Sequence, residues 1–194
     1  MNEIIEKIKA FGMTNQMITE DLQLIENQYS CDFGHLQRKL DVEEVYYPQF
    51  DAAVRLEAAL MSRQYEAFYC LEKTIRALIS ETLESAAGPD WWETKKIPDV
   101  VKLEVKSRIQ KELDSGMTRR SSDELDYTTF GELSIIINSN WELFGGLFSS
   151  RKALEKVMAN LNSLRGPIAH CSPLAEDEVL RLQLTVRDWF RLME

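Results

Sequence analysis

Hydrophobic residues recur at helical spacing along most of the chain after position 49, and the first such stretch is the longest. From Phe50 onward the apolar positions follow the 3.6-residue period of an amphipathic helix, namely Val54, Met61, Tyr65, Phe68, Leu71, Ile75, Leu78, Ile79 and Leu83. Gly88-Pro89 then supplies a stop signal. The pattern predicts a helix over residues 49–86, about 57 Å long at 1.5 Å per residue. Because a compact domain of this length has a radius of gyration of about 16 Å, the helix either kinks or forms the long spine of a bundle.

Shorter stretches repeat the helical pattern toward the C-terminus. Pro98 stands where a first helical turn tolerates proline, and Thr129-Phe-Gly-Glu132 has the form of a capping box. Ser172-Pro173 is expected to cap the last helix. The two C-terminal helices are marked by their apolar positions, Leu154, Val157, Met158, Leu161 and Leu164 in one and Val179, Leu182, Val186, Trp189, Phe190 and Met193 in the other. Sustained β-branched alternation is absent, so the sequence predicts an all-α helical bundle.

Domain organisation and location follow from breaks and composition. Residues 1–48 hold short helical patterns broken by glycines, which indicates an N-terminal helical appendage before a helical domain at 49–194. No stretch approaches the roughly 20 apolar residues of a membrane span, and the N-terminus lacks the features of a signal peptide. Three widely separated cysteines do not suggest a disulfide framework. A cytoplasmic protein without a membrane partner is expected.

The charge distribution restricts how this chain can bind nucleic acid. The net charge of −9 opposes binding through the whole surface. A local basic patch exists between Lys95 and Arg120, with eight cations against four anions. Lys102, Lys106 and Arg108 are its candidate phosphate-binding residues, and the alternative is a solvated helix face. The first fifty residues are acidic instead, with nine acids against four bases, which is compatible with a protein partner.

Motif inspection leaves one candidate catalytic pair. No nucleophile elbow, phosphate-cradling glycine loop or metal-ligand spacing is present, so neither a metal nor a cofactor is predicted. Arg165 and His170 remain, separated by Gly166-Pro167. On a straight helix, residues five apart point about 140° from each other. Proline disfavours helical geometry in the preceding residue, so the helix is expected to end or kink there and let the two side chains converge. The alternative for Arg165 is a favourable contact with the helix dipole.

The Arg-x4-His motif at the end of a helical bundle resembles the HEPN superfamily (higher eukaryotes and prokaryotes nucleotide-binding). More narrowly, the chain resembles the branch found at the tail of a nuclear transcript-surveillance endoribonuclease. The similarity covers roughly residues 50–190 and is carried by segments beginning at Tyr65, Gly88, Leu125, Asn140 and Leu164, which read YEAFYCLEKTIR, GPDWW, LDYTTFGEL, NWELF and LRGPIAH.

The resemblance implies a helical domain that forms a homodimer with both motifs facing one groove. Catalytic members are metal-independent endoribonucleases, often toxins or phage-defence effectors, so RNA is the implied substrate and an antitoxin a possible partner. Histidine readily takes and gives protons near neutral pH, and arginine can hold a phosphate by two parallel hydrogen bonds. His170 would therefore act as general acid or base, Arg165 would stabilise the phosphate, and a second His170 would come from the partner subunit.

Gly166 departs from this pattern, because many catalytic members carry a polar residue directly after the arginine. Asn162, one helical turn earlier, is a candidate for the missing polar contact, and Glu72 on the long helix is a candidate for orienting the site. Two other functions stay open on the sequence alone. One is a catalytically inactive RNA-binding module, and the other is a helical protein-interaction module.

Overall fold

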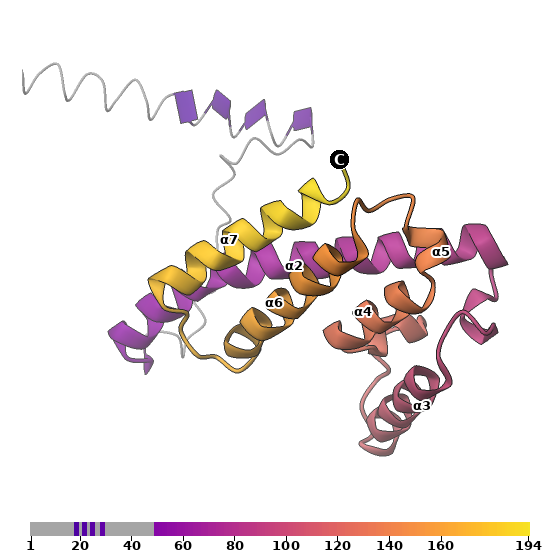
Figure 1. Cartoon of the computed structure of the whole chain (residues 1–194). Helices are drawn as coiled ribbons and strands as arrows, with labels where there is room; N and C mark the ends of the chain where they lie inside the picture. The colour runs from indigo at the N-terminus through magenta and orange to yellow at the C-terminus, as the bar shows by residue number, and fades with distance from the viewer. Residues whose placement is uncertain (1–17, 20, 23, 26–27, 30–48) are drawn as a thin grey trace, which may run out of the picture. The chain divides into compact units, whose positions relative to one another are not determined.

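The computed structural model describes residues 18–19, 21–22, 24–25, 28–29 and 49–194. The chain divides into two compact units, Met1–Asp51 and Ala52–Glu194. In the first unit the described pairs are helical, and most of the predicted appendage lies outside the described residues. The second unit carries the candidate site. Its described residues form helices without a strand, which confirms the all-α bundle (Figure 1).

Helix α2 (Ala52–Ala87) is the long spine that the hydrophobic pattern predicts. Its 36 residues run as one α-helix of about 54 Å. The stop signal acts as expected, because Gly88 adopts a φ of 82° and its N–H donates to the carbonyl of Glu84. That left-handed conformation suits a residue without a Cβ. Most of the other elements of this unit pack directly on this helix (Figure 1).

The middle of the unit is built from shorter elements. A 3-10 turn η2 (Trp91–Glu93) follows α2 and leads to α3 (Asp99–Asp114). A second turn, η3 (Glu124–Tyr127), precedes α4 (Phe130–Ser139) and the one-turn helix α5 (Trp141–Phe144). The predicted capping box is confirmed at the start of α4, where Thr129 and Glu132 exchange both of its hydrogen bonds. Within η3, Leu125 and Tyr127 are both buried.

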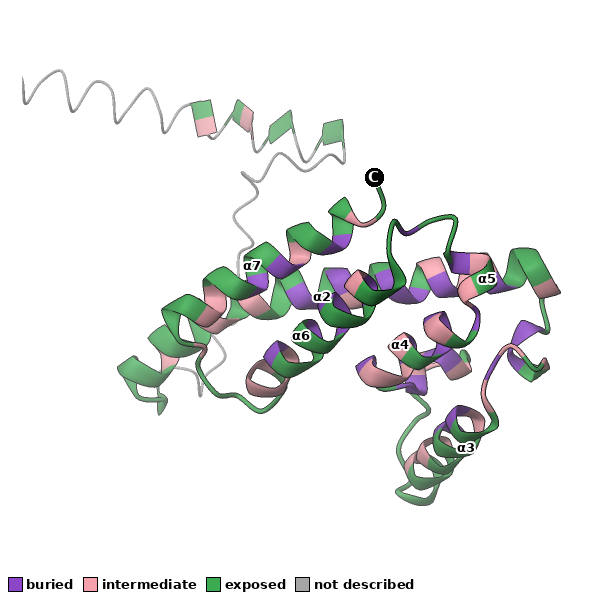
Figure 2. Ribbon diagram, in the orientation of Figure 1, coloured by how far each residue is buried: buried purple, intermediate pink, exposed green. Residues whose placement is uncertain are grey.

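Two long helices complete the bundle. Helix α6 (Arg151–Ala169) packs against α4, α2 and α7, and α7 (Glu176–Arg191) packs mainly against α6. Most of the fully buried side chains come from α2, α4 and α6, and the shorter elements and Trp189 of α7 supply the others. Figure 2 shows that the outer faces of α7 and α3 are exposed. Among the described residues, no helix is long and apolar enough to cross a membrane.

Burial corrects the predicted core in two places. The first part of the α2 stripe is not buried, since Val54 and Tyr65 are 57% and 58% exposed, and continuous burial begins at Phe68. On α7, Phe190 is exposed, whereas Thr185 is buried between Leu182 and Trp189. The reason is angular: Thr185 lies on the same face as those two residues, and Phe190 is rotated by about 100° from Trp189. Helix α7 also begins later than predicted, at an Ala175 N-cap without a side-chain cap.

A partly buried ion pair ties α3 to the start of α4. Arg108 donates from Nη1 and Nη2 to the two carboxylate oxygens of Glu132, at 2.7 and 2.9 Å. Burial pushes the pKa of Glu132 up, but hydrogen bonds from Arg108 and Thr129 outweigh it, and the pKa lies below its ordinary value. A lowered carboxyl pKa contributes stability that is present above the unfolded-state pKa and is lost as the pH falls through the folded-state pKa.

We therefore expect Glu132→Gln to destabilise the fold by about 2 kcal/mol at pH 7, and by less as the pH falls through the lowered folded-state pKa of Glu132, where the wild-type carboxylate becomes protonated. Glutamine keeps the capping box, so this variant isolates the ion pair. Urea denaturation at pH 7 and at a series of lower pH values measures the effect, and Glu132→Ala serves as the variant that loses the cap as well. A destabilisation that does not decrease as the pH is lowered would contradict the assignment.

Candidate functional site

The candidate site is built around a buried arginine of α2 that the sequence analysis did not single out. Arg76 is only 8% exposed. Its Nη1 donates to the backbone carbonyl of Leu125 and to Thr128 Oγ1, and its Nη2 donates to the carbonyl of Thr128 at 3.0 Å. These contacts anchor the guanidinium on the segment between η3 and α4. A sequence signal existed, because Arg76 directly follows Ile75 on the buried face of α2, where a lone arginine must be paired.

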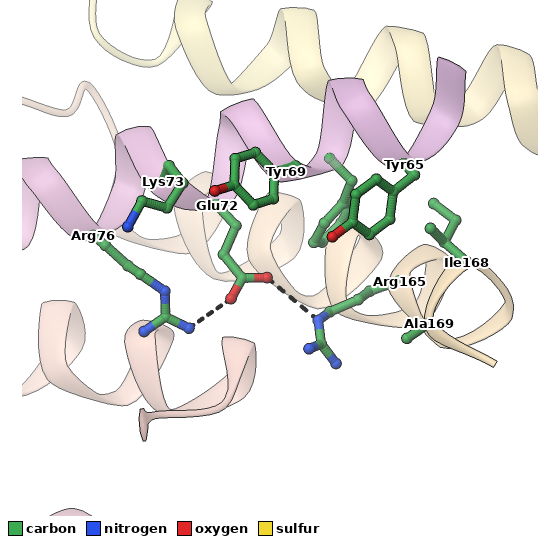
Figure 3. Close-up of a pocket in the computed structure, with 9 residues that line it drawn as sticks. Tyr65, Tyr69, Glu72, Lys73, Arg76, Arg165, Ile168 and Ala169 are labelled. Carbon is green, nitrogen blue, oxygen red and sulfur yellow. Dashed lines mark hydrogen bonds and ion pairs between the residues drawn. The ribbon is translucent and has the colours of Figure 1, made fainter. Parts of the chain in front are cut away.

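Glu72 stands one helical turn before Arg76 and connects it to α6. One carboxylate oxygen accepts from Arg76 Nη2, and the other accepts from Arg165 Nε at 3.3 Å (Figure 3). The carboxylate is 18% exposed, so water competes weakly with both bonds. The result is a fixed chain of three charged side chains, Arg76–Glu72–Arg165. Glu72 is among the predicted site residues, and the structure brings it into contact with Arg165 across 93 positions of sequence.

Arg165, the third of these charged side chains, has part of its guanidinium free of hydrogen bonds to the described residues. Arg165 is 40% exposed, and its only hydrogen bond to a described residue is the one from Nε to Glu72. Its terminal nitrogens Nη1 and Nη2 have no hydrogen-bond partner in the described part of the chain. A planar pair of free N–H groups is the geometry that binds phosphate in a bidentate manner. Glu72 thus orients Arg165 through Nε, and the two terminal nitrogens remain available to a ligand.

A cavity of about 210 Å³ opens beside this chain of charges. Its lining carries three cations and one carboxylate, so the local charge is positive although the whole chain is acidic. The lining residues are Tyr65, Phe68, Tyr69, Glu72, Lys73, Arg76, Arg165, Ile168 and Ala169 (Figure 3). Toward the start of α2 a second, more apolar cavity of about 420 Å³ follows, and Tyr65 and Ile168 line both. The two cavities are neighbours between α2 and the end of α6, and together they are called the groove below.

His170 lies at the end of α6, at the edge of this groove. It is exposed and lines neither cavity, but its neighbour Ala169 lines the first and Cys171 lines the second. Of the predicted end or kink of the helix at Gly166-Pro167, the end is wrong, because α6 continues through Pro167 to Ala169. A helical path leaves Arg165 and His170 on different faces. Within one protomer the two side chains therefore do not line the same cavity.

The chain ends α6 with a left-handed residue just after His170. Cys171 has a φ of 53°, and the N–H of Ser172 donates to the carbonyl of Pro167 at 2.9 Å. This is the six-to-one hydrogen bond of a Schellman cap, a position at which glycine is usual. A side chain with a Cβ is strained in this conformation. The cap fixes the backbone that carries His170.

We expect Cys171→Gly to stabilise the protein by about 0.5–1 kcal/mol, since relief of left-handed strain exceeds the added entropy of the unfolded glycine. Cys171→Ala is the matched control, because it removes the thiol and keeps the Cβ. Guanidinium denaturation of both variants measures the difference. Lower stability for the glycine variant than for the alanine variant would contradict the role of the φ angle.

The remaining predicted site residues lie apart from the groove. Asn162 is exposed on α6 near Gly131 and has no hydrogen bond to a described residue. Arg108 is engaged by Glu132 and by the carbonyl of Tyr127, so its role in the structure is to join α3 to α4. Lys102 and Lys106 have no ion pair with a described residue. Among the described residues, the part of the basic patch without an ion pair is thus Lys95, Lys102, Lys106 and Lys111, because Lys96, Arg119 and Arg120 are also paired with carboxylates.

A comparison with protein families identifies the domain. The model of the Swt1-like HEPN family matches residues 66–194, which is more than half of the chain. The chain belongs to the Swt1-like HEPN family. No curated protein and no solved structure matches the chain.

The extent of the family match has a consequence for the site. The matched region of this HEPN domain contains Glu72, Arg76, Arg165 and His170, so the chain of charges and the motif both lie inside it. Tyr65 and the exposed first part of α2 lie before it. Membership in the family points to a function connected with RNA. Among the described residues, no cluster of histidine, cysteine and carboxylate side chains is arranged to hold a metal ion.

Proposed function

We propose that this chain is a metal-independent endoribonuclease that works as a homodimer. The observation that carries the proposal is Arg165, which Glu72 orients through Nε while its terminal nitrogens stay open beside a positively charged cavity. In the reaction, Arg165 binds the scissile phosphate and stabilises the charge that develops on it. Free N–H groups aimed at one anion position suit this task better than a solvated lysine would.

His170 supplies proton transfer. As general base it takes the proton from a ribose 2′-hydroxyl, whose oxygen then attacks the adjacent phosphorus. The bond from phosphorus to the 5′-oxygen breaks, and a second histidine gives that oxygen its proton. The products are a 2′,3′-cyclic phosphate and a free 5′-hydroxyl. DNA lacks the attacking hydroxyl and is expected to resist.

Dimerisation belongs to the proposal for a geometric reason. His170 and Arg165 of one protomer line different surfaces, and one histidine cannot easily act as both acid and base. A two-fold dimer would bring a second His170 to each groove. Exposed apolar side chains on the first half of α2, among them Val54, Leu56 and Leu60, support a contact with another chain.

The direct test is cleavage of RNA by the purified full-length chain in EDTA. We expect cleavage with 2′,3′-cyclic phosphate ends, identified by mass spectrometry, and no cleavage of the same sequence as DNA. Sedimentation would give the mass of a dimer. Absence of cleavage at any enzyme concentration, or ends other than cyclic phosphate, would refute the ribonuclease proposal.

A second function is favoured by one observation. Gly166 follows the motif arginine, and His170 lies outside the cavity that holds Arg165, which suits an RNA-binding domain without catalysis. This alternative predicts salt-dependent RNA binding through Arg165, Lys102 and Lys106 without cleavage. The narrower relation to the nuclear transcript-surveillance branch, a toxin or phage-defence role, an antitoxin or other protein partner and a cytoplasmic location remain predictions from sequence.

A further inference from the structure

Two rows of side chains run along the groove face of α2. The inner row has Phe68, Glu72 and Arg76 at four-residue intervals and is buried or nearly so. The outer row has Tyr65, Tyr69 and Lys73 at the same spacing. In the outer row each side chain is more than half exposed, at 58%, 54% and 55%. The core does not explain these two tyrosines, because the inner row already supplies the buried contacts.

The two tyrosine rings form one aromatic surface. Their centroids are 6.0 Å apart and the ring planes are inclined by 32°. Figure 3 shows them adjacent along α2, and Arg165 lines the same cavity as both rings. Neither hydroxyl has a hydrogen bond to a described residue, so both are available to a ligand. A base inserted between two rings needs them to be roughly 7 Å apart, which is twice the distance between stacked bases. The two tyrosine rings are closer than this, so a base must stack on their outer faces.

Charge accompanies this aromatic surface on both sides. Arg165 lies next to Tyr65, and Lys73 continues the row after Tyr69 with a loose ion pair to Asp126 at 3.7 Å. Alternation of aromatic rings with phosphate-binding cations is the arrangement by which proteins bind single-stranded nucleic acid. Paired bases in an A-form duplex do not offer their faces to a protein, whereas unpaired bases do. The row spans about 12 Å along the helix, enough for a short unpaired segment.

We propose that Tyr65 and Tyr69 form a base-stacking platform that selects unpaired RNA for the groove. The proposal rests on the proposed action on RNA and assigns its substrate class. Bases stack on the two rings, Lys73 contacts the backbone beside them, and Arg165 receives the phosphate next to the stacked bases. A duplex can reach Arg165 only at a loop, bulge or end.

The test measures RNA binding separately from RNA cleavage. A fluorescein-labelled ten-nucleotide 2′-O-methyl oligouridine lacks the attacking hydroxyl, so anisotropy reports affinity alone. Tyr65→Leu and Tyr69→Leu keep apolar volume and remove the aromatic face, and Phe190→Leu on α7 is the matched control for loss of an exposed ring. We expect the double leucine variant to bind at least about tenfold more weakly than wild type, since stacking contributes strongly for each base. The control variant should match wild type, and a ten-base-pair RNA duplex should bind wild type more weakly than the single strand does.

The outcomes separate this proposal from the ribonuclease proposal. An unchanged affinity of the double variant, or equal binding of duplex and single strand, overturns the platform while cleavage by wild type still supports the enzyme. Tyrosine-dependent binding without cleavage in EDTA supports the platform and refutes the enzyme. A loss of dimer mass in the double variant without a change in RNA affinity assigns the rings to a protein contact and overturns the platform. No RNA binding by wild type refutes both, and circular dichroism confirms that each variant is folded.

Discussion

His170→Ala is expected to reduce the rate of RNA cleavage by about 10²–10⁴-fold, because it removes the group that transfers the proton. Binding of uncleavable RNA should change little, since His170 is exposed and lines neither cavity of the groove. Single-turnover cleavage of a labelled RNA gives the rate, and anisotropy gives the affinity. His35→Ala, which removes the chain's other histidine, is the matched control and should cleave like wild type. Equal cleavage by wild type and His170→Ala would remove His170 from the mechanism.

Mixed dimers test whether two copies of His170 act together. If each reaction needs one His170 as base and the partner's as acid, a dimer of wild type with His170→Ala is inactive. After unfolding and refolding of an equal mixture, roughly a quarter of the activity should remain. Independent sites would instead leave about half.

Arg165→Lys is expected to lower kcat by about 10²-fold although the positive charge is kept. Lysine has neither the Nε that donates to Glu72 nor the two parallel N–H groups for a phosphate. The loss should therefore appear in kcat more than in KM, as it does when an interaction made in the transition state is removed. Arg187→Lys, at an exposed position of α7 away from the groove, is the matched control. A variant that keeps wild-type kcat would show that Arg165 binds only by its charge.

Glu72→Gln tests how the orientation of Arg165 contributes to catalysis, because the variant leaves the positive charge of Arg165 in place. The variant weakens the hold on Arg165 Nε and removes a negative charge beside the cavity. We expect kcat to fall while RNA binds at least as tightly as before, since the local potential becomes more positive. If Glu72 has only a structural role, the variant should lower the melting temperature, and kcat should not fall while RNA binding stays as tight as in wild type.

Local patterns in the sequence determine much of this domain. The helical period of the apolar positions gives α2 as a spine, Gly88 ends it with a positive φ, and the Thr129–Glu132 capping box starts α4. Each of these features depends on contacts within about one helical turn, so the residues alone specify them. The motif of Arg165 and His170 is equally local, and the sequence places it at the end of a helix.

Tertiary packing decides what the pattern leaves open. Val54 and Leu83 have the same place in the helical period of α2, yet the first is exposed and the second fully buried, because the core contacts of α2 begin at Phe68, which packs on Phe130 of α4. Pro167 is accommodated inside α6, where its local preference predicts a break. Arg108 has a side chain suited to binding phosphate, but it is already paired with the carboxylate of Glu132.

The candidate site shows this division most clearly. The sequence by itself determined that Arg165 and His170 lie at a helix end and that Glu72 lies on the long helix. Only the tertiary structure decided that Arg76, held by the carbonyls of Leu125 and Thr128, fixes Glu72 against Arg165. Such a chain joins residues from three separate segments, and no period or propensity links them. Their contact exists because burial of Arg76 requires partners for its charge, and the fold supplies them at this one place.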